Sequence, residues 1–177
     1  MDKFYKPQID NELENILLQM CIKYFGELPP YSRKLSDTTL KDIKIELKKG
    51  HIYVAQNNNE IIGFCNLCFP YLDPRMEKYA DDQKCDLYIA GLIITETFQK
   101  KGYGEKLLKF SLKEENSKGK LGLITPLENK VAIALYKKIG MHIVTQFDQT
   151  EINFKTNQEF NSPRIVMIGD ISDIISL

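Results

Sequence analysis

The stretch Gln99-Lys100-Lys101-Gly102-Tyr103-Gly104 joins an apolar run at residues 87–94 to an amphipathic helical pattern that begins near Tyr103. Two glycines one residue apart let the backbone turn sharply and approach a ligand closely. The helix that follows directs unpaired N–H groups and the positive end of its dipole at that ligand, and the two lysines add positive charge. The stretch therefore predicts a strand, a binding loop and a helix, with a phosphate or pyrophosphate as the ligand.

Features that the stretch lacks narrow the class of ligand. A nucleotide-binding P-loop would end in Gly-Lys-Ser/Thr, but Gly104 is followed by Glu105 and Lys106. A dinucleotide-binding fingerprint would place a third glycine where this chain has Leu107. The remaining pattern is Gln-x-x-Gly-x-Gly between a buried strand and a helix. It resembles the coenzyme A pyrophosphate loop of the GNAT superfamily of N-acetyltransferases.

A second segment, residues 129–141, resembles another motif of the same superfamily, Asn-x-x-Ala-x-x-Leu-Tyr-x-x-x-Gly-Phe, and follows the loop in the same order. Asn129 and Tyr136 are separated by close to two helical turns, so their side chains share one helix face, roughly 10 Å apart along the axis. One extended ligand can therefore touch both. Asn129 also predicts a helix N-cap, and Gly140 predicts the left-handed residue that closes the helix.

Composition and charge agree with one domain that covers residues 1–177. An apolar fraction of 43% suits a full-sized core, and 24 basic residues balance 24 acidic ones. Without a basic excess, nucleic acid is not the expected partner. No run approaches the roughly 18 apolar residues that span a membrane, and the N-terminus has no signal-peptide pattern. We expect a cytoplasmic protein that does not bind membranes, and a homodimer is compatible with the sequence.

The four cysteines are Cys21, Cys65, Cys68 and Cys85. Cys65 and Cys68 have Cys-x-x-Cys spacing, but they lie in a strand pattern, where residues three apart face opposite ways. No second pair of cysteines or histidines completes a zinc site. Buried, reduced thiols and no bound metal are the expected reading.

Hydrophobic periodicity predicts one α/β unit with a mixed sheet. Asn57 to Glu60 form a good hairpin turn, and a second helix is expected to start behind Ser36 or Asp37 and to end at Gly50. The resemblance implies a GNAT-like, mostly antiparallel central sheet flanked by about four helices. The expected helices are residues 13–24, 37–50, 103–116 and 130–139, and the expected strands are 51–56, 61–69, 87–94, 121–125, 143–147 and 164–168. The short first strand that the resemblance implies is either at Phe4 and Tyr5 or absent.

The resemblance also implies acetyl-CoA as a co-substrate, bound by a core at about residues 86–144. The strand backbone of Leu92, Ile93 and Ile94 would pair with the pantetheine arm and polarise the acetyl carbonyl. The pyrophosphate loop would be Gln99, Lys100, Lys101, Gly102, Tyr103, Gly104 and Glu105. For Asn129, a direct ligand contact and an ordinary helix cap remain alternatives.

Tyr136 is the predicted general acid. An amine that attacks the thioester directly expels a thiolate, and a phenol with a pKa near 10 can protonate a leaving group with a pKa near 8.5. The alternative is a tyrosine packed on the sheet, because aromatic residues on the inner face of a helix usually belong to the core.

The general base is left open by the sequence. Some superfamily members carry a glutamate in the strand before Asn129, but Ile124 and Thr125 occupy that region here. Asp86 and Tyr88, two residues apart and so on one strand face, are the nearest candidates, although Asp86 alternatively caps a strand end. His51 and His142 are further candidates without supporting context.

The acceptor is expected to be a small-molecule or peptide amine. The resemblance implies that its site is built largely from the first two helices and their loop at residues 25–37, together with a loop at residues 70–84. There Asp73, Glu77, Asp81 and Asp82 would attract a cation. A polyamine, an aminoglycoside, an amino acid and a protein N-terminus stay open. Two other classes also stay open: a non-catalytic acyl-CoA-binding regulatory module, and a binding protein for another phosphorylated ligand.

Overall fold

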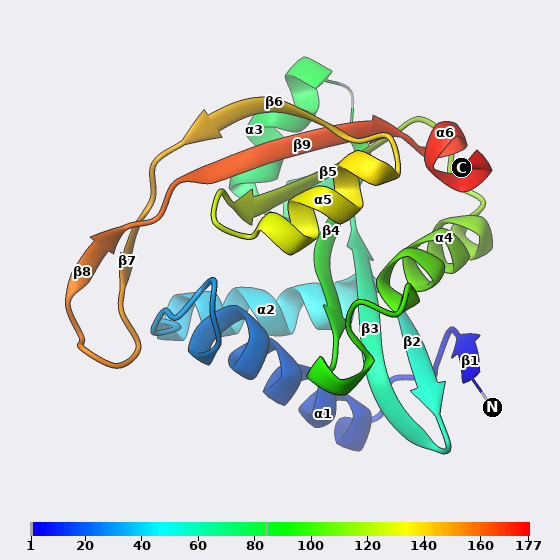
Figure 1. Ribbon diagram of the computed structural model, residues 1–177, viewed down its shortest axis with the longest axis horizontal. Helices are drawn as coiled ribbons and strands as arrows, with labels where there is room; N and C mark the ends of the chain where they lie inside the picture. The colour runs from blue at the N-terminus through cyan, green and yellow to red at the C-terminus, as the bar shows by residue number, and fades with distance from the viewer. Residues whose placement is uncertain (1, 84) are drawn as a thin grey trace.

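The computed structural model describes residues 2–83 and 85–177, except for the side chains of residues 79–83. Seven described strands form one sheet in the order β1-β2-β3-β4-β5-β9-β6 (Figure 1). Neighbouring strands are antiparallel except for β4 and β5, which are parallel, so the predicted mixed sheet is confirmed. The strands are β1 (Asp2–Tyr5), β2 (His51–Asn57), β3 (Glu60–Cys68), β4 (Cys85–Ile94), β5 (Lys120–Pro126), β6 (His142–Phe147) and β9 (Arg164–Asp170).

Helices cover both faces of the sheet (Figure 1). On one face lie α1 (Asn11–Ile22), α2 (Asp37–Lys49) and α3 (Pro74–Gln83), and on the other lie α4 (Tyr103–Glu115), α5 (Lys130–Lys138) and α6 (Ile171–Ser176). The four helices expected from periodicity are α1, α2, α4 and α5. The sequence did not predict α6, which has only six residues, or α3, whose described side chains include one buried apolar group, Met76. Neither produces a readable apolar stripe.

The prediction of a loop at residues 70–84 is therefore wrong. A short 3-10 turn, Pro70–Leu72, leads into α3. The Asp73 side chain accepts a hydrogen bond from the Arg75 amide at 2.9 Å, as an N-terminal helix residue does. Glu77 is exposed on this helix, and the predicted roles of the Asp81 and Asp82 side chains lie outside the described residues.

The structure confirms three local predictions, which concern a turn, a helix cap and a helix end. Asn58 and Asn59, in the turn between β2 and β3, have φ angles of 46° and 68°. Ser36 caps α2 by accepting from the Thr39 amide at 3.1 Å. Gly140 has a φ of 94°, which closes α5 in the left-handed conformation that glycine favours.

The two central strands separate partway along the sheet. Pairing between β4 and β5 joins residues 85–88 to residues 120–122, and no described pairing continues beyond Tyr88. Strand β4 stays paired with β3 as far as Ile94. The β5-facing backbone groups of residues 89–94 are therefore left without a strand partner, and backbone donors and acceptors of this kind need another partner or solvent.

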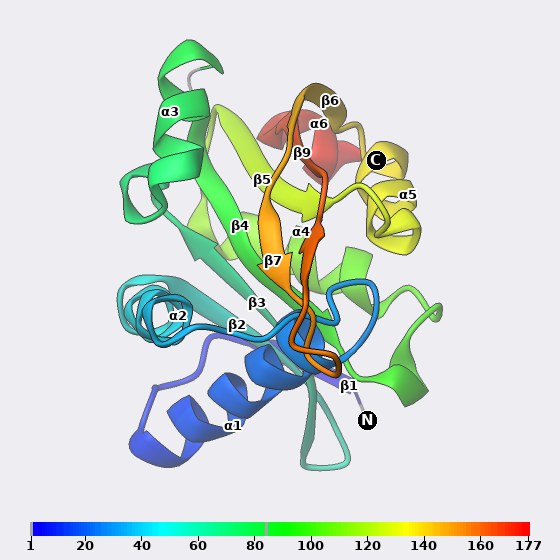
Figure 2. The ribbon, with the colours of Figure 1, turned by 90° about the vertical axis from the view of Figure 1, so that its left-hand side faces the viewer.

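A two-stranded hairpin, β7 (Thr150–Ile152) and β8 (Glu159–Asn161), interrupts the chain between β6 and β9. We call residues 148–163 the arm. In Figure 2 the arm reaches from the ends of β6 and β9 towards the loop between α1 and α2. Two backbone hydrogen bonds fasten it there: the Lys34 amide donates to Ile152 at 2.7 Å and the Phe154 amide donates to Ser32 at 2.9 Å. None of the helices in the described chain is long and apolar enough to cross a membrane.

Candidate active site

A cavity of about 450 Å³ occupies the gap between the diverging halves of β4 and β5. Its walls are residues 89–94 of β4, residues 123–125 of β5, the start of α4 and one face of α5. Lys101 is not among the lining residues, and its Nζ lies 5.5 Å from the centroid of the Phe98 ring. The predicted site residues that line this first cavity are Leu92, Ile93, Ile94, Gln99, Lys100, Gly102, Tyr103, Gly104, Glu105, Asn129 and Tyr136.

Helix α4 begins at this first cavity without a side-chain cap. Its N-cap residue is Gly102, whose φ of 83° favours glycine. Helices α1, α2 and α5, by contrast, are capped by Asp10, Ser36 and Asn129. In the described chain, the first amides of α4 are therefore left to donate to a ligand, and the helix dipole favours an anion there.

Gln99, Tyr103 and Glu105 in this loop have protein partners for their side chains. Gln99 Nε2 donates to the Ile94 carbonyl at 2.8 Å, which ties the loop to the end of β4. Glu105 accepts from Lys138 at 2.7 Å and from Lys109 at 2.9 Å, and these hydrogen bonds lower the pKa of its carboxyl. The Tyr103 hydroxyl donates to Asp2 at 2.7 Å. The loop's capacity to bind a ligand therefore lies chiefly in its backbone.

Helix α5 presents Asn129 and Tyr136 to the first cavity. Asn129 is a helix cap, since its Oδ1 accepts from the Ala132 amide at 3.3 Å. Tyr136 is only 6% exposed and packs in the main core, but its hydroxyl has no hydrogen-bond partner among the described residues. Burial raises the pKa of this phenol, so it stays protonated. Tyr136 thus combines a core position with a donor next to the cavity.

A second cavity of about 270 Å³ lies on the other side of the gap, among α2, β4, the start of α3 and part of the arm. The segment at residues 25–37 contributes Phe25, Tyr31 and Arg33, and residues 72–76 contribute the start of α3. The two cavities meet between β4 and β5, because both are lined by Phe25, Tyr31, Ile89, Ala90, Gly91 and Ile124.

Glu46 is the carboxylate of α2 that lines the second cavity together with Tyr88 of β4. The Tyr88 hydroxyl donates to Glu46 Oε1 at 2.5 Å. Burial raises the pKa of Glu46 to about 7, against the lowering effect of this hydrogen bond. Burial also raises the pKa of Tyr88, which therefore remains the donor. A carboxyl with such a pKa can accept a proton near neutral pH.

The sequence reading missed Glu46, although it carries a signal. On α2 it lies beside Ile43 and Leu47, the two buried apolar residues of the helix, and a charged residue at that place departs from an amphipathic pattern. Arg164, which begins the apolar strand β9, departs from its pattern in the same way.

The other candidate bases lie elsewhere. Asp86 accepts from the Lys120 amide at 2.9 Å, which matches its alternative role at a strand end, and it lines neither cavity. His51 forms a short contact with Glu115, and His142 is exposed on the edge strand β6. Of the sequence candidates, Tyr88 alone lines one of these two cavities.

Cys65 and Cys68 belong to different buried clusters, so the predicted opposite orientation on one strand is confirmed. Burial raises the pKa of Cys65 to about 12, which makes its thiol unreactive at neutral pH. Among the described residues, no group of three or more His, Cys, Asp or Glu side chains is arranged to hold a metal ion.

A mixed sheet whose central strands diverge around a cavity, beside an uncapped helix N-terminus, defines an α/β protein that can hold a long anionic ligand between its strands. The model of the acetyltransferase (GNAT) family matches residues 14–141, which is most of the chain. The protein therefore belongs to the acetyltransferase (GNAT) family, as the two sequence motifs predict.

Solved structures share the fold along nearly the whole chain. A Bacillus subtilis acetyltransferase in complex with CoA has 16% identity and a TM-score of 0.63, covering 96% of this chain and 99% of its own. A GNAT family acetyltransferase from Elizabethkingia anophelis with acetyl-CoA bound has 22% identity, a TM-score of 0.58 and coverage of 96% and 97%. NAA60 from Arabidopsis thaliana, in complex with a bisubstrate analogue, has 18% identity, a TM-score of 0.64 and coverage of 94% and 97%. Comparison with curated proteins finds no match.

Proposed function

We propose that the protein is an acetyl-CoA-dependent N-acetyltransferase that moves an acetyl group to a primary amine by direct attack on the thioester. The observation that carries the proposal is the meeting of the two cavities between β4 and β5. One cavity offers an uncapped helix and unpaired strand backbone, and the other offers a carboxyl with a pKa near neutrality. Structural neighbours with CoA and acetyl-CoA bound support the choice of co-substrate.

In this proposal acetyl-CoA supplies the acetyl thioester, and the chain positions it. The amides at the start of α4, from Gly102 to Glu105, bind the pyrophosphate, and Lys100 and Lys101 add positive charge. The backbone groups of Leu92, Ile93 and Ile94 that face β5, on the edge of β4 not paired with β3, bind the pantetheine arm and the acetyl carbonyl.

Two side chains handle the protons. An alkylamine with a pKa near 10 arrives mostly protonated, so a group in the acceptor cavity must take its proton. We assign this to Glu46, directly or through one water, with Tyr88 donating a hydrogen bond to the same carboxylate. The amine then attacks the acetyl carbon and the carbon–sulfur bond breaks. The nitrogen gives up its second proton as the amide forms, and the departing thiolate, which accepts a hydrogen bond from the Tyr136 hydroxyl, takes that proton up to leave as the coenzyme A thiol. Because burial raises the pKa of Tyr136, its contribution is chiefly this hydrogen bond.

The alternative of a non-catalytic acyl-CoA-binding module drew its support from the absence of a glutamate at the strand before Asn129. Glu46 offers a carboxyl from α2 instead. The alternative therefore loses the sequence feature that favoured it.

Calorimetric titration with acetyl-CoA, coenzyme A, ATP and NADH tests the proposal first. We expect selective binding of acetyl-CoA and coenzyme A, and then release of coenzyme A thiol when primary amines are added. Binding without transfer to any amine would favour the non-catalytic module. A preference for ATP or NADH would identify the uncapped helix as a site for another phosphorylated ligand.

A further inference from the structure

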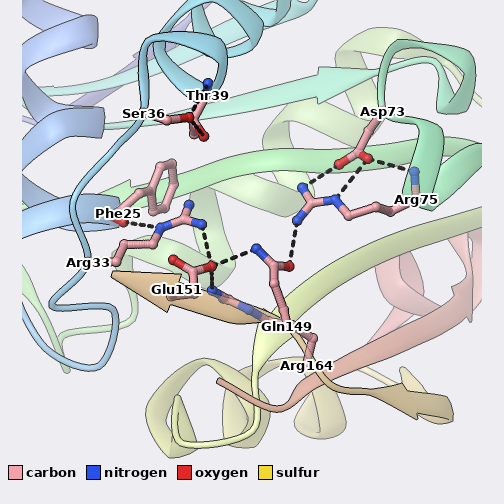
Figure 3. Close-up of polar contacts among 9 residues, drawn as sticks. All are labelled: Phe25, Arg33, Ser36, Thr39, Asp73, Arg75, Gln149, Glu151 and Arg164. Atoms are coloured by element: carbon pink, nitrogen blue, oxygen red, sulfur yellow. Dashed lines mark hydrogen bonds and ion pairs between the residues drawn. The ribbon is translucent and has the colours of Figure 1, made fainter. Parts of the chain in front are cut away.

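Two arginines on the wall of the second cavity share one carboxylate (Figure 3). Arg33 Nη1 donates to Glu151 Oε1 at 2.8 Å, and Arg164 Nη2 donates to the same oxygen at 2.5 Å. Gln149 Nε2 also donates to this oxygen, at 2.6 Å. The cluster of Arg33, Glu151 and Arg164 therefore holds two positive charges and one negative charge.

The unbalanced charge is buried. Arg164 is 3% exposed, and its Nε has no hydrogen-bond partner among the described residues. Burial lowers the pKa of this guanidinium. Buried polar atoms in proteins almost always have partners, and a buried charge without an opposite charge is costly. The cluster thus has the composition of a site that lacks one anion.

The other described carboxylates on the cavity wall, Asp42, Glu46 and Asp73, do not form an ion pair with Arg33 or Arg164. Asp73 is occupied by Arg75, which it binds through both carboxylate oxygens at 3.0 and 2.7 Å. Figure 3 shows Arg75 and Arg33 approaching from opposite sides, with Gln149 and Glu151 between them. Glu46 has its hydrogen bond from Tyr88.

The arginine pair also lies close to where the two cavities meet. The guanidinium carbons of Arg33 and Arg164 are each 5.5 Å from the centroid of the Tyr31 ring. Tyr31 lines both cavities. A small molecule with one group at the arginines can therefore extend past Tyr31 towards the gap between β4 and β5.

We propose that the acceptor is a small amine that also carries a carboxylate, such as an amino acid, and that Arg33 and Arg164 bind this carboxylate. The planar fork of a guanidinium matches a carboxylate, and charge-assisted hydrogen bonds of this kind are strong. A cavity of about 270 Å³ suits a molecule of this size. The inference rests on the proposed transfer to an amine and specifies its substrate.

The test uses matched pairs of amines: alanine, β-alanine and lysine against their carboxamides. Binding to the 177-residue chain is measured by calorimetry with coenzyme A present, and transfer is measured by thiol release from acetyl-CoA. Rates are corrected for the fraction of unprotonated amine, because the amide forms have lower amine pKa values. For at least one pair, we expect the carboxylate form to bind and react at least about tenfold better, the effect of one charge-assisted hydrogen bond.

Three variants separate carboxylate binding from a purely structural role of the cluster. For each pair of amines we compare the carboxylate-to-amide ratio, which is the corrected transfer rate of the carboxylate form divided by that of the carboxamide form. Arg33→Gln is expected to bring this ratio close to one. Glu151→Gln, which removes the competing carboxylate, is expected to raise the ratio. Lys34→Gln changes a neighbouring exposed cation that does not line the cavity, and should leave the ratio unchanged. The ratio is independent of how much of each preparation is folded.

Failure of this inference is distinguishable from failure of the proposed function. Transfer to amines with equal use of carboxylate and amide forms would overturn the inference and keep the acetyltransferase. Selective binding of carboxylates without any transfer would support the anion site and count against the acetyltransferase. If neither form of any amine binds, the inference is overturned. It is also overturned if Arg33→Gln and Glu151→Gln lower stability while the carboxylate-to-amide ratio stays fixed, because the cluster then serves only to hold the arm against the rest of the protein.

Discussion

The two sides of the gap between β4 and β5 are built in different ways. The first cavity, beside α4, is formed by a contiguous region from residue 89 to residue 138, with additional contacts from residues 24–31. The groups that we propose bind the co-substrate there are mainly backbone amides and carbonyls, positioned by Gly102 and by the separation of two strands. The second cavity draws its polar side chains from the loop between α1 and α2, from α2, the start of α3, β4, the arm and β9, among other segments.

This difference predicts how substitutions will act on each side. A backbone site tolerates many side chains, since its donors belong to the loop conformation. A side-chain site assembled from distant segments changes its specificity with each substitution. We therefore expect substitutions on the α4 side to affect co-substrate binding uniformly, and substitutions on the α2 side to affect the choice and activation of the amine.

The largest expected effect is on the α4 side. Gly104→Asp places a carboxylate in the first turn of α4, where the helix dipole stabilises it but where a pyrophosphate would be repelled. A Cβ at Gly104 meets nothing closer than 3.4 Å, so the fold accommodates it. We expect acetyl-CoA affinity to fall by about a thousandfold or more, from several lost charge-assisted hydrogen bonds, with the melting temperature unchanged or higher.

Thr38→Asp is the matched control, because it adds the same charge to the exposed first turn of α2, a helix that does not line the first cavity. It should leave acetyl-CoA binding intact in calorimetry. Similar affinity losses in both variants would mean that charge alone, and not the α4 backbone, governs binding.

The same division explains what could be predicted from sequence. Glycines with positive φ, caps such as Asn129, and a loop made of contiguous residues leave a local pattern, so the fold and the α4 side were readable. The arginine cluster depends on residues 33, 151 and 164, whose proximity is set by how the arm packs on the loop between α1 and α2. No local period carries that information. Helix α3 was not predicted because its sequence is mostly polar and therefore has no apolar stripe with a helical period.

A second prediction concerns Glu46. Glu46→Gln keeps the size of the side chain and removes the proton acceptor, so kcat should fall about 100-fold with little change in acetyl-CoA affinity. In the wild type, kcat/KM should rise with pH through an apparent pKa near 7, as the carboxyl ionises. This step should be absent in the variant. Glu77→Gln, an exposed carboxylate on α3, is the control and should keep the wild-type profile.

The raised pKa of Glu46 also predicts a gain in stability when it is replaced. The folded carboxyl binds its proton more tightly than the unfolded one, so stability falls as pH rises from about 4.5 to about 7. Glu46→Gln should therefore raise the free energy of unfolding above neutral pH by about 1–3 kcal/mol, and the gain should disappear near pH 4. Denaturant titrations at the two pH values measure this. A variant that is less stable at both would place Glu46 among structural hydrogen-bonding groups.

Tyr136→Phe is expected to have a smaller effect on turnover. The ring is buried in the core and is retained, and only a hydroxyl next to the first cavity is lost. Since its raised pKa makes the phenol a hydrogen-bond donor more than a proton donor, kcat should fall about tenfold. Affinity for acetyl-CoA should stay within about twofold. Full activity of the variant would show that Tyr136 has only a structural role.

The smallest expected effect is on acetyl-CoA affinity, and it distinguishes Lys100 from Lys101, to which the sequence analysis assigned the same role. Lys100 lines the first cavity, whereas Lys101 places its Nζ near the Phe98 ring. Lys100→Gln should weaken acetyl-CoA binding about threefold, and the loss should shrink at high salt because an exposed charge is screened. Lys101→Gln should change affinity less, and its residual effect should be equally sensitive to salt. If Lys101→Gln weakens binding more, the lysines act through direct contact with the phosphates, and the α4 side depends on side chains as well as on its backbone.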